Sequence, residues 1–111
     1  MIPDNNRPRL QDMRLNARRA VDFAGAKGAG DLLREYAVLH AIQIVGEAAA
    51  KISDQTKAGT PEVPWPQIIG MRHILVHAYD GVDPGFVDLT VRESLPTLVG
   101  LLNDILAEDT P

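Results

Sequence analysis

The chain has 111 residues, of which 45% are hydrophobic and 23% are charged. This length and balance predict a single domain over residues 1–111 and exclude a disordered chain or two domains of ordinary size. It has no cysteine, which excludes disulfides and thiolate metal sites, and its net charge of −4 argues against a general nucleic-acid binder. No run approaches the roughly 18 apolar residues of a membrane span, and the start does not resemble a signal peptide. We therefore expect a cytoplasmic protein without membrane contact.

The basic residues are gathered near the start of the chain. Five of the eleven lie within the first nineteen positions, at Arg7, Arg9, Arg14, Arg18 and Arg19. This asymmetry is compatible with a positive end on an acidic protein, but it is more often the solvated face of a first helix.

Two helices are predicted in the first half. Residues 9–25 have apolar side chains at helical spacing, and we expect this helix to end between Ala24 and Lys27, after a flexible N-terminus over residues 1–8. Asp31 is predicted to cap a second helix that extends to about Lys57. That helix is apolar on more than one side, so we expect its own bundle and a second subunit of a symmetric homodimer to cover it.

Three polar residues lie along one side of this second helix. His40, Gln43 and Glu47 occupy positions i, i+3 and i+7, which lie on one side of a helix. A half-exposed polar surface and the lining of a functional cleft explain this spacing equally well, so Glu47 is only a supporting site candidate.

The second half predicts two further helices. Three prolines surround Trp65, which we expect to anchor a loop on the core before Pro66 begins a helix through Val76. The last helix is predicted from Phe86 or Leu89 to Ala107, and Pro96 requires either a start near Ser94 or a kink. No strand pattern is present, so the fold class is an all-α bundle of four to five helices.

Residues 70–83, "GMRHILVHAYDGVD", contain the reactive side chains Arg72, His77 and Tyr79, with His73 and Asp80 as supporting candidates. Arginine is a permanent cation suited to phosphate, and histidine transfers protons near neutral pH. Together they suit attack on a phosphodiester, and RNA supplies its own nucleophile, the 2′-hydroxyl.

The spacing raises a geometric difficulty. On a regular helix, residues 72 and 77 are separated by about 140° around the axis. The helix must therefore loosen near Val76, or the long arginine must reach round it, or a symmetric partner must supply one of the two residues.

Two other interpretations of this stretch remain. His73 and His77 have the spacing of a zinc pair, and Asp80 or Asp83 could add a ligand. Ile74, however, stands where a His-Glu-x-x-His motif has its glutamate, so we expect no metal and no cofactor. In a purely structural interpretation, one histidine is buried and hydrogen-bonded, and the other polar residues face solvent.

Three stretches together resemble the HepT-like toxins, also called the DUF86 family, a branch of the HEPN ribonucleases. Arg72-x4-His77-x-Tyr79 is similar to the family's R-x4-H-x-Y motif. "LHAIQIVGEAAAKIS" (39–53) resembles its second-helix signature, and "PEVPWPQIIGMR" (61–72) resembles its approach to the motif. The resemblance covers residues 10–108 in the same order. In one departure, His73 stands where the family usually has asparagine; if both His73 and His77 were protonated, each would lower the pKa of the other.

The resemblance implies a homodimeric, metal-independent endoribonuclease with Arg72 and His77 as the catalytic pair. It implies the toxin of a type VII-like toxin–antitoxin pair, neutralised by a cognate minimal nucleotidyltransferase that transfers AMP to Tyr79. An alternative is a non-catalytic subunit that carries substrate or nucleic acid to a nucleotidyltransferase. Turnover of RNA by the isolated protein distinguishes the two.

Overall fold

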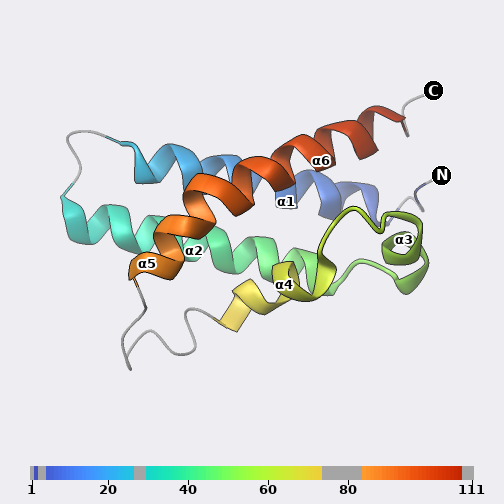
Figure 1. Ribbon diagram of the computed structural model, residues 1–111, viewed down its shortest axis with the longest axis horizontal. Coiled ribbons are helices and arrows are strands. Elements are labelled where there is room, and N and C mark those ends of the chain that lie inside the picture. Colours follow the sequence, from blue (N-terminus) through green and yellow to red (C-terminus); the bar gives the residue numbers. More distant parts are fainter. Residues whose placement is uncertain (1, 3–4, 27–29, 74–83, 109–111) are drawn as a thin grey trace.

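The computed structural model describes residue 2 and residues 5–26, 30–73 and 84–108 (Figure 1). Every regular element in these ranges is helical, which confirms the all-α prediction. The elements are α1 (Arg7–Ala24), α2 (Asp31–Ala50), α3 (Asp54–Gly59), α4 (Trp65–Gly70), the 3₁₀ turn η1 (Met71–His73), α5 (Pro84–Leu89), the π-turn η3 (Thr90–Ser94) and α6 (Leu95–Glu108).

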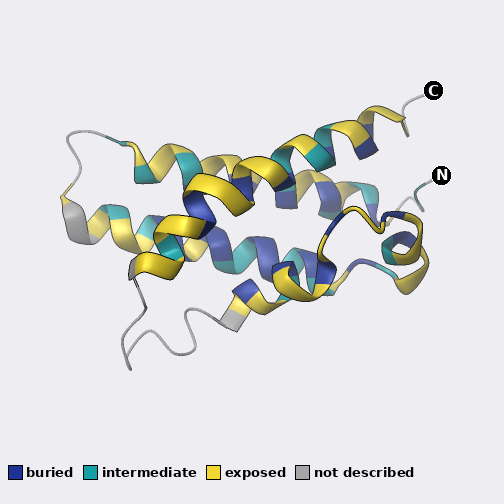
Figure 2. Ribbon diagram, viewed as in Figure 1, coloured by how far each residue is buried: buried dark blue, intermediate teal, exposed yellow. Residues whose placement is uncertain are grey.

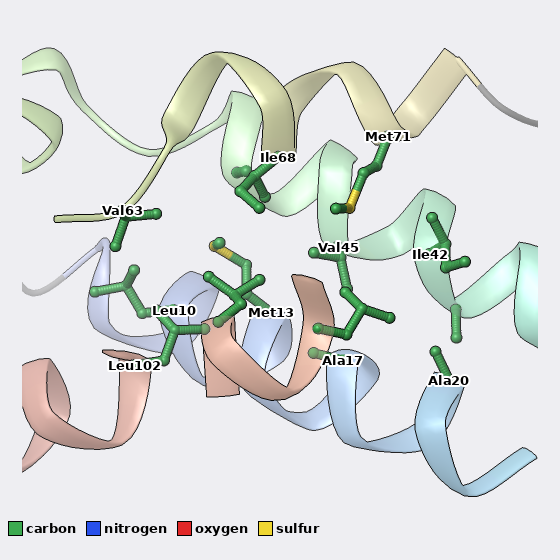
Figure 3. Packing of buried hydrophobic residues seen from close by; sticks show 14 of the residues in the cluster. Leu10, Met13, Ala17, Ala20, Ile42, Val45, Val63, Ile68, Met71 and Leu102 are labelled. Atoms are coloured by element: carbon green, nitrogen blue, oxygen red, sulfur yellow. The ribbon is translucent and has the colours of Figure 1, made fainter. Parts of the chain in front are cut away.

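The core lies where α1, α2 and α6 meet. α1 and α2 form an antiparallel pair, α6 packs along α1, and α4 with η1 packs against α2 (Figure 1). Side chains at helical spacing on α1, such as Leu10 and Met13, are fully buried against Val45 of α2 and Leu102 of α6 (Figure 3). The spacing that predicted an amphipathic first helix therefore selects the face that is buried.

α1 begins earlier than we predicted, because Asn6 is tied to a distant loop. Its side chain is fully buried, and its Nδ2 donates hydrogen bonds to Ser53 Oγ at 2.8 Å and Thr56 Oγ1 at 3.1 Å. Its Oδ1 accepts a hydrogen bond from the backbone N–H of Ser53 at 3.2 Å. Residues 6–8 are therefore part of the fold and not of the flexible N-terminus that we predicted over residues 1–8.

The boundaries of α2 also differ from the prediction. Gly30, and not Asp31, is the N-cap residue, and the helix ends at Ala50 instead of near Lys57. The chain turns there because Ser53 caps α3, its Oγ accepting a hydrogen bond from the Thr56 N–H. A serine followed by an acidic residue is typical of the start of a helix. The prediction of one helix through to about Lys57 did not take Ser53 and Asp54 into account in this way.

Trp65 anchors the loop before α4, as predicted. Its side chain is buried, and its indole N–H donates to the carbonyl oxygen and the hydroxyl oxygen of Thr60, both at 3.2 Å. Since the indole is packed and its N–H is satisfied, it fixes the start of α4 on the core.

The last predicted helix is divided by a π-turn. Leu95 N–H donates to the carbonyl of Thr90, five residues back, and the Thr90 hydroxyl donates to the carbonyl of Phe86 at 2.8 Å. Pro96 has no N–H for a regular bond to residue 92, so the widened turn falls just before it. Pro96 predicted either a helix start near Ser94 or a kink. In the structure α6 begins at Leu95, and the π-turn joins it without a gap to α5.

One side of α2 carries apolar side chains that the described residues do not cover. Leu33 is 68% exposed and Tyr36 is 62% exposed, whereas the half of α2 nearer its end is largely buried (Figure 2). None of the helices in the described ranges is long and apolar enough to span a membrane.

Candidate functional site

Arg72 is held by a close contact between η1 and α2. Gly46 is buried on α2, and a β-carbon at this position would lie 3.0 Å from both Cα and Cβ of Arg72 and closer still to its backbone nitrogen. Contacts this short are not tolerated, so glycine is required for η1 to approach α2. The backbone of Arg72 is thereby fixed on the core.

The side chain of Arg72 is exposed, although its backbone is tightly packed. Met71, immediately before it, is buried and fastens η1 to the core (Figure 3). A buried neighbour and an exposed guanidinium together leave the cation accessible to an anion from solvent.

The chain changes helix type at Arg72. α4 ends at Gly70 and Met71–His73 form a 3₁₀ turn, which has three residues per turn instead of 3.6. The angle of about 140° between residues 72 and 77 assumes a regular α-helix throughout. The step from Arg72 to His73 does not follow that geometry, because both residues lie in the 3₁₀ turn. His77, Tyr79, Asp80, Asp83 and Val76, where we expected loosening, lie outside the described residues, as does the side chain of His73.

Glu47 lies on a different side of α2 from the residue that contacts Arg72. It is exposed, its Oε1 accepts a hydrogen bond from Gln43 Nε2 at 2.9 Å, and it lines a shallow hollow with Arg9 and Lys51. His40 is also exposed. The structure thus places the predicted polar set on the surface, and Glu47 next to the start of α1.

An apolar recess lies beside Met71, between α4 and the α5–α6 segment. Its volume is about 660 Å³, and its lining includes Ile68, Phe86, Leu89 and Leu98. Arg72 is not among the lining residues, so the recess itself offers no cation to a phosphate.

In the described ranges, no three His, Asp or Glu side chains are close enough together to hold a metal ion. The structure does not describe the side chains of the metal ligands considered from the sequence, which are His73, His77, Asp80 and Asp83. The prediction that no metal binds there is therefore not tested by the described residues.

The close approach of Gly46 to Arg72 was not predicted from the sequence. Gly46 lies inside the second helix that we predicted and within the stretch 39–53 quoted above. A glycine inside a strong helical pattern often marks a close approach of backbone, and this was the available signal.

The chain is similar to known proteins along most of its length. The family model "Ribonuclease HepT-like" matches residues 13–105. A "Probable ribonuclease HepT" of Thermococcus cleftensis is 41% identical over 70 residues, which are 63% of this chain and 64% of that protein. A "Putative RNase MJ1380" of Methanocaldococcus jannaschii is 38% identical over 63 residues, 57% of this chain and 58% of that protein.

These matches cover less than two thirds of either relative's length. A further relative from M. jannaschii, "Putative RNase MJ0127", is 23% identical over 90% of this chain and 89% of its own length. No solved structure matches the chain significantly. Because the family model spans most of the chain and the described fold is all-α, the chain belongs to the HepT-like ribonuclease family.

Proposed function

We propose that this protein is a metal-independent endoribonuclease, the toxin of a type VII-like toxin–antitoxin pair, with Arg72 and His77 as its catalytic residues. The observation that carries the proposal is the contact of Arg72 with Gly46, which fixes the arginine backbone while its guanidinium is exposed. Membership of the HepT-like family supports the choice of RNA as substrate.

In the proposed reaction, the 2′-oxygen of a nucleotide attacks the neighbouring phosphorus and the bond to the 5′-oxygen breaks. His77 moves a proton, either from the attacking hydroxyl or to the leaving oxygen. Arg72 stabilises the negative charge that develops on the phosphoryl oxygens. Neither a metal ion nor a protein nucleophile takes part.

We propose that the protein acts as a symmetric homodimer. Leu33 and Tyr36 leave an apolar surface on α2 that the described part of the chain does not cover. A second copy related by a two-fold axis would bury the same surface on both subunits. Such a dimer would also allow Arg72 and His77 of one site to come from different chains.

We further propose that a cognate minimal nucleotidyltransferase neutralises the toxin by transferring AMP to Tyr79. The modification adds a bulky phosphate two residues from His77. That phosphate would compete with RNA for the Arg72 guanidinium, because both present the same anionic oxygens.

The test is RNA turnover by the purified protein without a partner, in the presence and absence of EDTA. We expect cleavage that EDTA does not affect and that Arg72→Gln and His77→Ala each abolish without loss of helical circular dichroism. Arg19→Gln, which removes the same charge from an exposed arginine, is the matched control for the first variant.

Persistent cleavage by a folded His77→Ala protein would contradict the catalytic assignment. RNA binding without turnover by the wild type would support instead the non-catalytic subunit of a nucleotidyltransferase complex.

A further inference from the structure

Two arginines of α1 meet at a single side-chain oxygen of α6. Arg14 Nη1 donates to Asn103 Oδ1 at 3.1 Å, and Arg18 Nη2 donates to the same oxygen at 3.0 Å. Since both nitrogens bind one atom, they are at most about 6 Å apart. The basic residues at the start of the chain are thus not merely spread over a solvated helix, because two of them converge on one point.

This cluster, Arg14, Arg18 and Asn103, has an uncompensated charge. An amide oxygen is neutral and has two lone pairs, so two donors use its capacity without cancelling either cation. Among the described residues, no carboxylate forms an ion pair with Arg14 or Arg18. Two adjacent cations around a neutral acceptor repel each other unless an anion joins them.

The cluster is also accessible. Arg18 is exposed, Arg14 and Asn103 are partly exposed, and a β-carbon at Gly100, one turn before Asn103, would meet no atom within 4 Å. Each guanidinium has five N–H donors in a planar fork, and only one is used in the contact with Asn103. The remaining donors suit an anion with two or more oxygens.

We infer that the cluster binds a phosphate of the RNA backbone at a place separate from Arg72. This inference rests on the proposed function, which makes RNA the substrate. The cluster joins α1 to α6, whereas Arg72 packs on α2, so the two cationic positions do not touch. In a chain with a net charge of −4, a local pair of arginines supplies backbone affinity that the protein as a whole lacks.

Asn103→Asp is the sharpest test, because it changes one atom's chemistry while keeping the shape of the side chain. The new carboxylate forms an ion pair with both arginines, so the melting temperature is expected to stay equal or rise. The same carboxylate repels phosphate, so we expect the Kd for a labelled single-stranded RNA at low salt to rise at least about tenfold. Binding is measured by fluorescence anisotropy in a His77→Ala background, which blocks cleavage.

Arg18→Gln and Arg19→Gln form a matched pair. Both remove one positive charge from an exposed arginine of α1, but only Arg18 belongs to the cluster. Losing one phosphate contact to a single strand is expected to reduce the slope of log Kd against log salt by roughly 0.7. We expect that reduction for Arg18→Gln and an unchanged slope for Arg19→Gln.

Cleavage rates separate this inference from the proposed function. With the active chain, Asn103→Asp is expected to raise KM and leave kcat unchanged, because the cluster does not contact Arg72. If RNA binds through the cluster but is never cleaved, the proposed ribonuclease activity is contradicted and the phosphate-binding inference is supported. If Asn103→Asp and its parent bind RNA with equal affinity, the phosphate-binding inference is contradicted, and the proposed ribonuclease activity is unaffected. Tighter binding of polyglutamate than of RNA with equal charge would also overturn the inference, in favour of an acidic protein surface.

Discussion

Gly46 and Arg72 lie so close together that a β-carbon on residue 46 would be 3.0 Å from Arg72 Cα. Replacing glycine by alanine inside a helix normally stabilises it by about 0.5–1 kcal/mol. Here the added carbon must displace backbone, which costs about 1–3 kcal/mol. We expect Gly46→Ala to lower the free energy of unfolding in urea and to reduce RNA cleavage, because η1 moves away from α2.

Gly100→Ala on α6 is the control for stability, since nothing lies within 4 Å of its β-carbon. It is expected to raise the free energy of unfolding by about 0.5–1 kcal/mol. Equal effects of the two substitutions would contradict the close contact at Gly46.

Asn6→Ala is expected to lower the free energy of unfolding by about 1–3 kcal/mol, because it leaves the backbone N–H of Ser53 without its acceptor. Asn5→Ala, one residue earlier and exposed, is expected to change it by less than about 0.5 kcal/mol. Chemical denaturation followed by circular dichroism measures both. A small effect at Asn6 would show that α1 does not depend on its link to the loop before α3.

Trp65→Phe is expected to destabilise the protein by roughly 1–3 kcal/mol, although the ring stays apolar. The carbonyl of Thr60 loses the indole donor but keeps its hydrogen bond from the Val63 N–H at 3.2 Å. The larger part of the cost is therefore the space left in the core when the indole is replaced by the smaller phenyl ring. Gln67→Ala, on the exposed surface of α4, serves as control and should change the free energy of unfolding by less than about 0.5 kcal/mol. Thermal denaturation checks the order of the two variants.

The double substitution Leu33→Ser and Tyr36→Ser is expected to halve the mass measured by light scattering after gel filtration. Both side chains are more than 60% exposed in the single chain, so their replacement removes little intramolecular packing. Leu15→Ser, at a leucine that is 44% exposed on α1, is expected to leave the mass unchanged. An unaltered dimer in the double variant would place the interface elsewhere.

The features predicted correctly from the sequence are those that depend on periodicity and strong local signals. The spacing of Leu10 and Met13 identified the buried face of α1, and the prolines around Trp65 indicated an anchored loop. Both are local properties, since the apolar period and proline chemistry act within a few residues.

The features that were missed depend on contacts between distant residues. Asn6 pairs with Ser53, and Arg14 and Arg18 with Asn103, across separations that no local pattern reveals. The partner of Gly46 likewise lies on another element. For the site, the sequence named Arg72 and His77, but it could not show that Arg72 stands at a change of helix type.

The π-turn over Thr90–Ser94 is equivalent to one extra residue in an otherwise continuous helix from Pro84 to Glu108. Removing one residue there would restore regular geometry and rotate α5 by about 100° around its axis. Phe86 and Leu89, which line the apolar recess, would then face a different direction while α6 kept its place in the core. The number of residues in this turn therefore sets the shape of the recess. Within the family, an insertion or deletion at this point would remodel that surface in one step, which substitution of its lining residues could not do.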